Sequence, residues 1–275
     1  MGTFGEYLDA REHNRSTFPE TVRPAFEISI RAFDQLALQL RDGRDRNDKT
    51  AASLAPFFFI LQRQALAAYD ALSTNQAYLA WVLIRPGVES ALIIGKWVDD
   101  EIHARIWEKR RTNMKAYRKV YEGKALRSKS LPRSDEIQLS LSGINDRFLH
   151  PNPEYYFRHL ELNELAGGAV EMKLNVFDEP TDVAVGVLGV LHLVVVIQDC
   201  LARLFANTFP NLSRIDVGLT SLETGMGEWA GSVMRESIQA HDALRVLGLW
   251  PESYAEAEGL HHQIDSAGSA PTSGA

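Results

Sequence analysis

The sequence contains a single cysteine, and this scarcity sets the first limits on its chemistry. Because Cys200 stands alone, the chain can form no internal disulfide and no zinc site built from several thiolates. The sequence also lacks a glycine-rich phosphate-binding loop placed after a strand, and it lacks a Gly-x-Ser-x-Gly nucleophile turn. No complete catalytic signature is present, and we expect neither a bound cofactor nor a metal ion.

Long hydrophobic runs are missing as well. The longest, residues 183–197, has fifteen residues including His192, and Gln198 and Asp199 follow it at once. A membrane-spanning helix needs roughly 20 apolar residues, so we interpret this run as a central bundle helix. The first residues have no basic region followed by an apolar one, which predicts no secretory signal. We therefore expect a cytoplasmic protein with no membrane partner.

Apolar residues are nevertheless plentiful, at 45% of 275 residues, which is ample for a core. Helical periodicity predicts helices over residues 22–41, 50–72, 75–98, 101–124, 134–150, 183–207 and 222–247. Alternating apolar residues over 156–163 and 169–176 predict a β-hairpin. The predicted fold class is mainly α, a helical bundle of six or seven helices with one small β-hairpin insertion.

The domain organisation follows from the same patterns. Residues 1–21 are predicted to form an irregular N-terminal arm, and residues 22–250 a single helical domain. Residues 251–275 are rich in Ser, Gly, Ala and Pro, a composition typical of a disordered tail.

Two opposite charges interrupt the apolar helix predicted over residues 75–98. Arg85 and Glu89 are four residues apart and therefore share one helix face. Because an unpaired buried charge is costly, we expect them to be mostly buried and bonded to each other or to a neighbouring helix. Pro86 is expected to kink this helix. The pair is either a structural ion pair or part of a pocket in which Arg85 binds an anion.

The net charge of −7 conceals a basic segment. Residues 103–133 contain eleven Lys and Arg residues against two Glu, so this segment carries +9. It contains the candidate nucleic-acid-binding residues Arg110, Arg111, Lys115, Arg118 and Lys119. The interleaved rings of Trp107, Tyr117 and Tyr121 are predicted to stack on bases. The alternative interpretation is an ordinary solvated helix face.

Polar residues crowd the end of the helix predicted over 134–150, in the sequence Asn145-Asp146-Arg147-Phe148-Leu149-His150. Histidine is a common general base, and a nearby arginine can stabilise charge that develops on a phosphate. His150 and Arg147 are therefore the candidate catalytic residues, with Asn145 and Asp146 beside them. The alternative is a helix end whose basic residues complement the helix dipole.

His192 is a further candidate pocket residue, because it is alone on an apolar helix. The structural interpretation is a core histidine bonded to a neighbour. Asp99, Asp100 and His103 fall within about one turn, but a di-metal bundle needs a Glu-x-x-His motif on each of two helices, and no second copy exists.

The order of these elements resembles a group of bacterial helical proteins related to the HEPN superfamily (higher eukaryotes and prokaryotes nucleotide-binding). The resemblance rests on Leu-Ile-Arg-Pro-Gly-Val-Glu-Ser, then a basic helix, then Asn-Asp-Arg-Phe-Leu-His-Pro, a hairpin and a long apolar helix. It implies an α-helical bundle that forms a homodimer, and a metal-independent ribonuclease in a defence or toxin–antitoxin system. That family places four to six residues between its arginine and its histidine, whereas two separate Arg147 from His150.

The sequence thus leads to one preferred function and two alternatives. We expect a HEPN-like protein that binds RNA or a nucleotide, in a defence or toxin-like role, with metal-independent RNA cleavage left open. One alternative is a non-enzymatic scaffold or interaction protein whose core charges are structural. The other is a small-molecule enzyme that uses a pocket at the kinked helix.

Overall fold

The computed structural model describes residues 4–34 with gaps, 49–149, 159–165 and 168–208. Within these ranges the protein is mainly α-helical with one antiparallel β-hairpin, which confirms the predicted fold class. The hairpin strands are β1 (Leu160–Glu164) and β2 (Val170–Leu174). The α-helices are α1 (Phe4–Thr17), α3 (Lys49–Ser73), α4 (Ala77–Asp99), α5 (Glu101–Glu108), α6 (Met114–Tyr121), α7 (Ser134–Ile144) and α9 (Pro180–Thr208).

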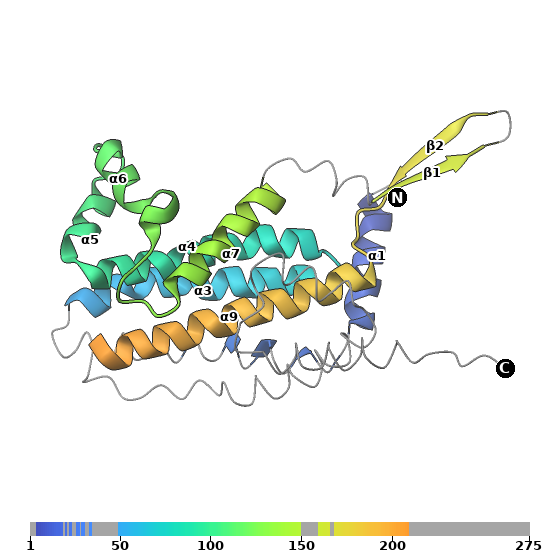
Figure 1. The fold of residues 1–275 in the computed structure, drawn as a ribbon. Helices are drawn as coiled ribbons and strands as arrows, with labels where there is room; N and C mark the ends of the chain where they lie inside the picture. Colours follow the sequence, from blue (N-terminus) through green and yellow to red (C-terminus); the bar gives the residue numbers. More distant parts are fainter. Residues whose placement is uncertain are drawn as a thin grey trace, which may run out of the picture.

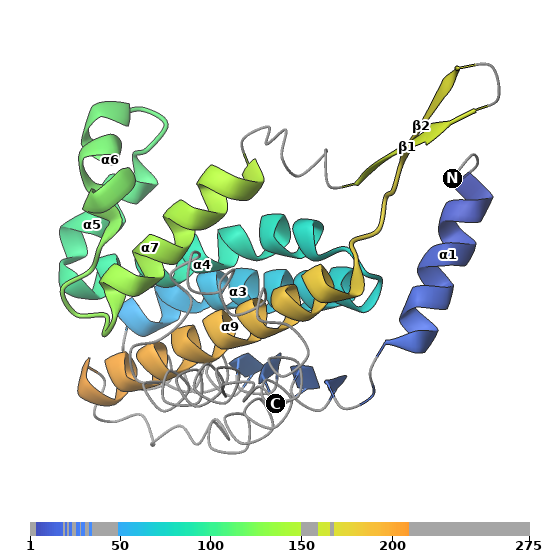
Figure 2. The ribbon, with the colours of Figure 1, turned by 45° about the vertical axis from the view of Figure 1, so that its right-hand side comes forward.

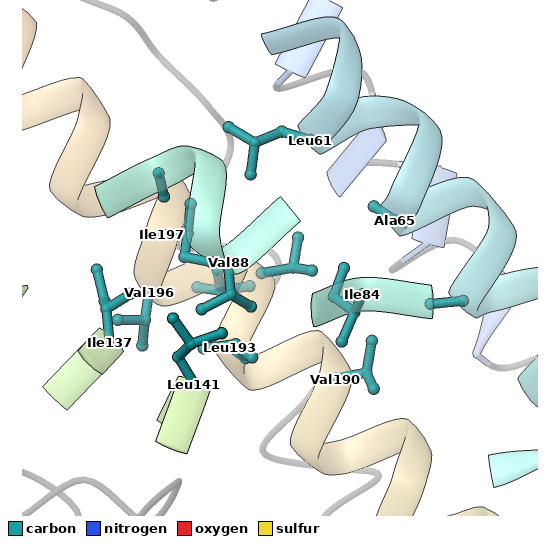
Figure 3. Close-up of a cluster of buried hydrophobic side chains, with 14 of the residues drawn as sticks. Leu61, Ala65, Ile84, Val88, Ile137, Leu141, Val190, Leu193, Val196 and Ile197 are labelled. Carbon is teal, nitrogen blue, oxygen red and sulfur yellow. The ribbon is translucent and has the colours of Figure 1, made fainter. Parts of the chain in front are cut away.

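Helix α4 is the element around which the others pack. Its neighbours are α3, α5, α7 and α9, and α3, α4 and α9 run side by side along the long axis of the molecule (Figure 1). Helices α5 and α6 lie at one end, whereas the β-hairpin projects from the other end (Figure 2). The core contains apolar side chains from four helices, among them Leu61, Ile84, Val88, Leu141 and Leu193 (Figure 3). Burial on nearly every side explains why α4 and α9 are so apolar.

The connection between α3 and α4 is a tight helix stop. Asn75 has a positive φ of 56°, and its N–H bonds to the Leu72 carbonyl, while the Gln76 N–H bonds to the Ala71 carbonyl. This pair of bonds is the Schellman arrangement, in which a left-handed residue closes a helix. In the sequence analysis Asn75 is the first residue of the helix predicted over 75–98. It ends α3 instead, and Gln76 occupies the N-cap position of α4.

The prediction of a single basic helix over residues 101–124 is wrong, because two short helices, α5 and α6, cover this segment. The chain turns after Glu108, and Asn113 accepts a hydrogen bond from the Ala116 N–H at 3.1 Å. Asn113 is therefore the N-cap of α6, and asparagine favours this position. Asp100 caps α5 in the same way, accepting from the Ile102 N–H at 2.9 Å.

The prediction of an irregular arm at the N-terminus is also wrong, because residues 4–17 form α1. This helix has no apolar stripe to reveal it in the sequence. Contacts from distant parts of the chain hold it: Asp70 accepts hydrogen bonds from Arg11 at 2.6 Å and from Arg15 at 2.5 Å. Tyr7 also stacks on Phe177, with ring centroids 5.7 Å apart.

Several predicted segments lie outside the described residues. They are most of the helix over 22–41, the helix over 222–247, the tail over 251–275, and the outer parts of the predicted hairpin strands before residue 159. Where the hairpin is described, its antiparallel pairing confirms the predicted alternation, with Leu162 opposite Met172.

Two helices, α4 and residues Asp182–Ala206 of α9, are long and apolar enough to cross a membrane. Their most apolar windows have mean hydropathies of 1.4 and 2.1, and 61% and 78% of those windows are buried inside the protein. Core helices of soluble proteins meet the same criterion of length and composition. The cytoplasmic location and the absence of a membrane partner therefore stay predictions.

Neighbouring side chains lie so close to two glycines that an added methyl group would not fit without a shift, and this leads to a first prediction. A Cβ added to Gly95 of α4 would lie 2.7 Å from Ser128 Cβ and 2.8 Å from Leu131 Cβ, and one added to Gly186 of α9 would lie 2.8 Å from Ala77 Cβ. Overpacking of this kind typically lowers the free energy of unfolding by about 1–3 kcal/mol. We therefore expect Gly95→Ala and Gly186→Ala to unfold at lower urea concentration than the wild type.

Gly87→Ala is the matched control for this prediction. A Cβ at Gly87 would meet Gln64 Cβ at 3.4 Å, which is ordinary contact. The gain in helix propensity from Gly to Ala is up to about 1 kcal/mol, so this variant should be as stable as the wild type or more stable. Equal unfolding midpoints for Gly95→Ala and Gly87→Ala would contradict the close approach.

Candidate functional site

The two charges on α4 form an ion pair, and the first residue after α7 joins them. Arg85 Nη1 donates to Glu89 Oε2 at 2.6 Å, and Arg85 Nε donates to Asn145 Oδ1 at 3.0 Å. The expected contacts, to each other and to a neighbouring segment, are therefore present. The two side chains are mostly buried, as expected, with exposed fractions of 29% for Arg85 and 24% for Glu89. We call Arg85, Glu89 and Asn145 the polar triad.

The exposure of the polar triad leaves Arg85 accessible to a ligand. Two of its three nitrogens are occupied, whereas Nη2 makes no hydrogen bond to any residue in the described part of the chain. A guanidinium fixed by two partners with one edge open is suited to binding an anionic oxygen. The triad thus supports both of the interpretations drawn from the sequence, a structural ion pair and an anion site.

Helix α7 does not continue to residue 150 as predicted, but passes into a π-helical turn over Asn145–Leu149. The Phe148 ring holds this turn against α4. It stacks on Trp81, with centroids 5.6 Å apart, and meets Tyr78 edge-on at 5.7 Å. The Tyr78 hydroxyl also donates to the Phe148 carbonyl at 2.7 Å. Such π-turns occur often at functional sites, and this one contains three candidate residues, Asn145, Asp146 and Arg147.

The π-turn gives its polar residues different surroundings. Asn145 binds Arg85, whereas Asp146 is exposed and Arg147 is half-buried. Neither Asp146 nor Arg147 makes an ion pair with a described residue. His150 lies outside the described residues, so its role as a general base stays a prediction.

The basic segment forms the exposed side of the α5–α6 hairpin. On α6, Lys115, Arg118 and Lys119 share one face because they are spaced by three and four residues. Arg118 pairs with Glu122 at 3.2 Å. Four exposed cations of the hairpin make no ion pair with a described residue, namely Lys109, Arg111, Lys115 and Lys119. We call this surface, together with Arg110 and Arg118, the basic face.

The sequence predicted that the aromatic residues of this hairpin stack on bases beside the basic residues. In the structure these rings do not lie on the basic face. Trp107, Tyr117 and Tyr121 pack on one another, with centroids 5.2 to 5.8 Å apart. Trp97 donates from Nε1 to the Tyr121 hydroxyl at 3.1 Å, and Tyr121 is buried. The amphipathic patterns of α5 and α6 turn these rings inward, so they hold the hairpin on the bundle and leave its charges outside. Arg110 lies over the Trp107 ring at 4.7 Å.

The basic face and the polar triad are electrostatic neighbours. Burial is the main cause that raises the pKa of Tyr117, and the negative charge of Glu89 raises it further. The positive charges of Arg110 and Arg85 act on the same hydroxyl in the opposite direction. The Tyr117 hydroxyl therefore lies within the field of charges from both groups.

His192 does not join this group. Burial is the first cause that lowers its pKa to about 4, and the charged groups that act on it are Arg133 and Glu136. These residues lie at the start of α7, whereas Asn145 lies after its end, roughly 16 Å along the helix at 1.5 Å per residue. The charges that act on His192 thus come from the start of α7, and the polar triad is not among them.

Asp99, Asp100 and His103 each have a structural role. Asp99 accepts from the Ser128 hydroxyl at 2.9 Å and from the backbone N–H groups of Lys129 and Ser130. Burial alone would raise the pKa of Asp99, but these hydrogen bonds outweigh it and lower the pKa. His103 Nδ1 bonds to the Lys96 carbonyl at 2.7 Å. No cluster of metal-ligating side chains occurs among the residues that the structure describes.

Sequence reasoning missed one buried polar pair. His159 Nε2 lies 3.3 Å from Asp178 Oδ1, and both side chains are about 4% exposed or less. Asp178 also accepts from the Tyr78 N–H at 3.2 Å, and its own N–H donates to the Asn75 carbonyl at 2.8 Å. The pair thus ties the base of the β-hairpin to the start of α4. Asp178 lies just before α9 in sequence, so nothing local indicated that it serves α4.

Comparisons of the chain with protein-family models, with curated proteins and with solved structures each found no match.

Proposed function

We propose that the protein binds RNA or a nucleotide, and that the phosphate groups contact the basic face. The observation that carries this proposal is the set of four exposed cations on the α5–α6 hairpin without an ion pair to a described residue. Exposed cations release counterions from a phosphate chain when they bind it. A chain with a net charge of −7 gains little from non-specific attraction, so a local site must supply the binding.

The inward packing of the aromatic rings affects the mode of recognition. Trp107, Tyr117 and Tyr121 are engaged with one another, so the proposal uses phosphate contacts and no base stacking. Phosphate contacts position a nucleic acid but carry no sequence information. We therefore propose sequence-tolerant binding, strongest at low salt, with Arg85 Nη2 as a further donor near the basic face.

The test is a reversal of charge on the basic face. Lys115→Glu/Lys119→Glu should raise the Kd for single-stranded RNA at least about tenfold at 50 mM salt, and should lower the slope of log K against log salt by about 1.4, since each phosphate contact on a single strand contributes about 0.7. Fluorescence anisotropy over a salt series measures both quantities.

Arg63→Glu/Arg203→Glu is the matched control, because it changes the net charge equally at exposed positions of α3 and α9. This control should lose far less affinity than the variant of the basic face. Wild-type protein that binds no RNA at about 50 mM salt, or an equal loss in both double variants, contradicts the proposal.

A metal-independent cleavage of the bound RNA is the second candidate function. The π-turn favours it, because this turn places Arg147 two residues after Asn145, which binds Arg85. A cluster of arginines near one anion site can stabilise the charge that develops on a phosphate during cleavage. By contrast, the surroundings of Gly87 offer little to the alternative of a small-molecule pocket at Pro86, since Leu61 and Gln64 of α3 pack there.

A further inference from the structure

The β-hairpin presents an apolar face to solvent. Leu162, Val170 and Met172 alternate with polar residues and share one side of the ribbon, where they are 62%, 56% and 70% exposed. The hairpin projects away from the helices in both views (Figures 1 and 2). A two-stranded ribbon on its own is marginally stable in water. These features indicate that the ribbon has a partner.

The backbone of the hairpin shows which groups are available to that partner. The Leu165 N–H bonds to the Ala169 carbonyl, and the Asn175 N–H bonds to the His159 carbonyl. Residues 165/169 and 159/175 are therefore hydrogen-bonded pairs, and such pairs alternate along an antiparallel ladder. By this alternation, residues 170, 172 and 174 of β2 direct their N–H and C=O groups to the outer edge of the ribbon.

The outer edge of β2 is self-complementary in charge. Its sequence is Val-Glu-Met-Lys-Leu, with Glu171 and Lys173 placed symmetrically about Met172. When two such strands meet antiparallel about a two-fold axis at Met172, Glu171 of each lies opposite Lys173 of the other. Residues 171 and 173 would then form the non-hydrogen-bonded pairs, in which side chains approach most closely. Cross-strand pairs of opposite charge stabilise a sheet.

We propose that β2 pairs edge to edge with β2 of a second copy of this chain, so that two hairpins form one four-stranded antiparallel sheet. The Met172 N–H of each copy then donates to the Met172 carbonyl of the other. A two-fold interface uses the same surface on both copies, as this strand requires. The proposal concerns a different surface from the basic face and does not depend on RNA binding.

The outer edge of β1 fits a second copy less well. A two-fold axis at Leu162 would place Glu161 opposite Asn163 and Leu160 opposite Glu164. No pair of opposite charges results, and one apolar residue meets a carboxylate. Charge therefore distinguishes the two edges of the same ribbon and assigns the interface to β2.

Proline substitution tests this assignment directly. Met172→Pro removes the outward N–H of β2 and leaves the bonds to β1 intact, because proline is tolerated on the free edge of a strand. We expect the dimer Kd, measured by sedimentation equilibrium, to rise at least about tenfold, since both central hydrogen bonds of the interface are lost. Leu162→Pro is the matched control: it removes the equivalent outward N–H of β1 and should leave the dimer Kd unchanged.

Charge variants give a second, independent readout. Glu171→Lys and Lys173→Glu should each weaken the dimer, because each sets like charges opposite one another. Mixing the two single variants should produce heterodimers by native mass spectrometry, and the double variant Glu171→Lys/Lys173→Glu should dimerise like the wild type.

Three results would overturn the proposal. They are a wild type that stays monomeric at millimolar concentration, a dimer weakened equally by Leu162→Pro and Met172→Pro, and single charge variants that fail to recombine.

Discussion

Acidification from pH 7 to pH 4 is expected to lower the free energy of unfolding of the wild type by about 3 kcal/mol more than that of a His192→Leu variant. Burial is the main cause that lowers the pKa of His192 to about 4, and the positive charge of Arg133 lowers it further. In the unfolded chain the same imidazole titrates near its usual pKa of about 6.5.

The sign of this effect follows from proton binding. Between pH 6.5 and pH 4 the unfolded chain binds a proton at residue 192, whereas the folded protein does not. The stability contributed by the neutral imidazole is therefore complete above pH 6.5 and is lost progressively as the pH falls toward 4. Asp99 acts in a lower window, because its lowered pKa means that its contribution is lost only below the usual carboxylate range of about 4.

Urea unfolding at each pH unit between 7 and 4 measures this dependence. Replacement by leucine removes the titrating group from an apolar helix and should flatten the curve between pH 6.5 and pH 4. His13→Asn is the matched control, because it removes an exposed histidine of α1 and should preserve the wild-type curve. A His192→Leu curve parallel to that of the wild type would show that His192 does not cause the acid sensitivity.

Long, strongly periodic segments were predictable from the sequence because local pattern and tertiary packing agree in them. The helix over 75–98 corresponds to α4, and that over 183–207 to α9, because a helix that is apolar on nearly every side is stable when it is buried. The pair of Arg85 and Glu89 was predictable for a related reason, since four-residue spacing brings two side chains together in any α-helix.

Elements that depend on distant partners were not predictable in this way. Helix α1 owes its ion pairs to Asp70, and Asp178 caps α4, which it follows by some eighty residues. The break between α5 and α6 has a local cause, the cap at Asn113, but uninterrupted basic residues across it concealed the turn. The π-turn was hidden because it depends on the packing of Phe148 between Tyr78 and Trp81.

The contacts of the candidate site show the same difference between local pattern and distant packing. The sequence indicated that Arg85 bonds to Glu89 or to a neighbouring helix, and the structure adds Asn145 to Glu89 as a partner. By contrast, the orientation of the rings in the α5–α6 hairpin depends on other helices, because Phe57 of α3 contacts Trp107 and Trp97 of α4 bonds to Tyr121. Spacing along the chain fixed which residues share a face, but only packing fixed which face is covered.

If the protein is a ribonuclease, His150→Ala is expected to lower the rate of RNA cleavage by roughly 10²–10⁴-fold, the magnitude usual for removal of a general base. In the sequence His150 follows Leu149, the last residue of the π-turn that contains Arg147. A histidine there can accept the proton of a ribose 2′-hydroxyl, while Arg147 stabilises the charge that develops on the adjacent phosphate. Arg147→Ala should therefore also lower kcat.

The split between kcat and KM separates this role from RNA binding. Lys115→Glu/Lys119→Glu should raise KM and leave kcat nearly unchanged, because these two lysines of α6 are proposed to contact phosphates in binding alone. His150→Ala should show the reverse, with a melting temperature equal to that of the wild type. If the wild type cleaves no RNA and His150→Ala lowers the melting temperature, His150 is a structural residue at a helix end and the cleavage hypothesis fails. RNA binding at the basic face would then be tested separately, by its salt dependence.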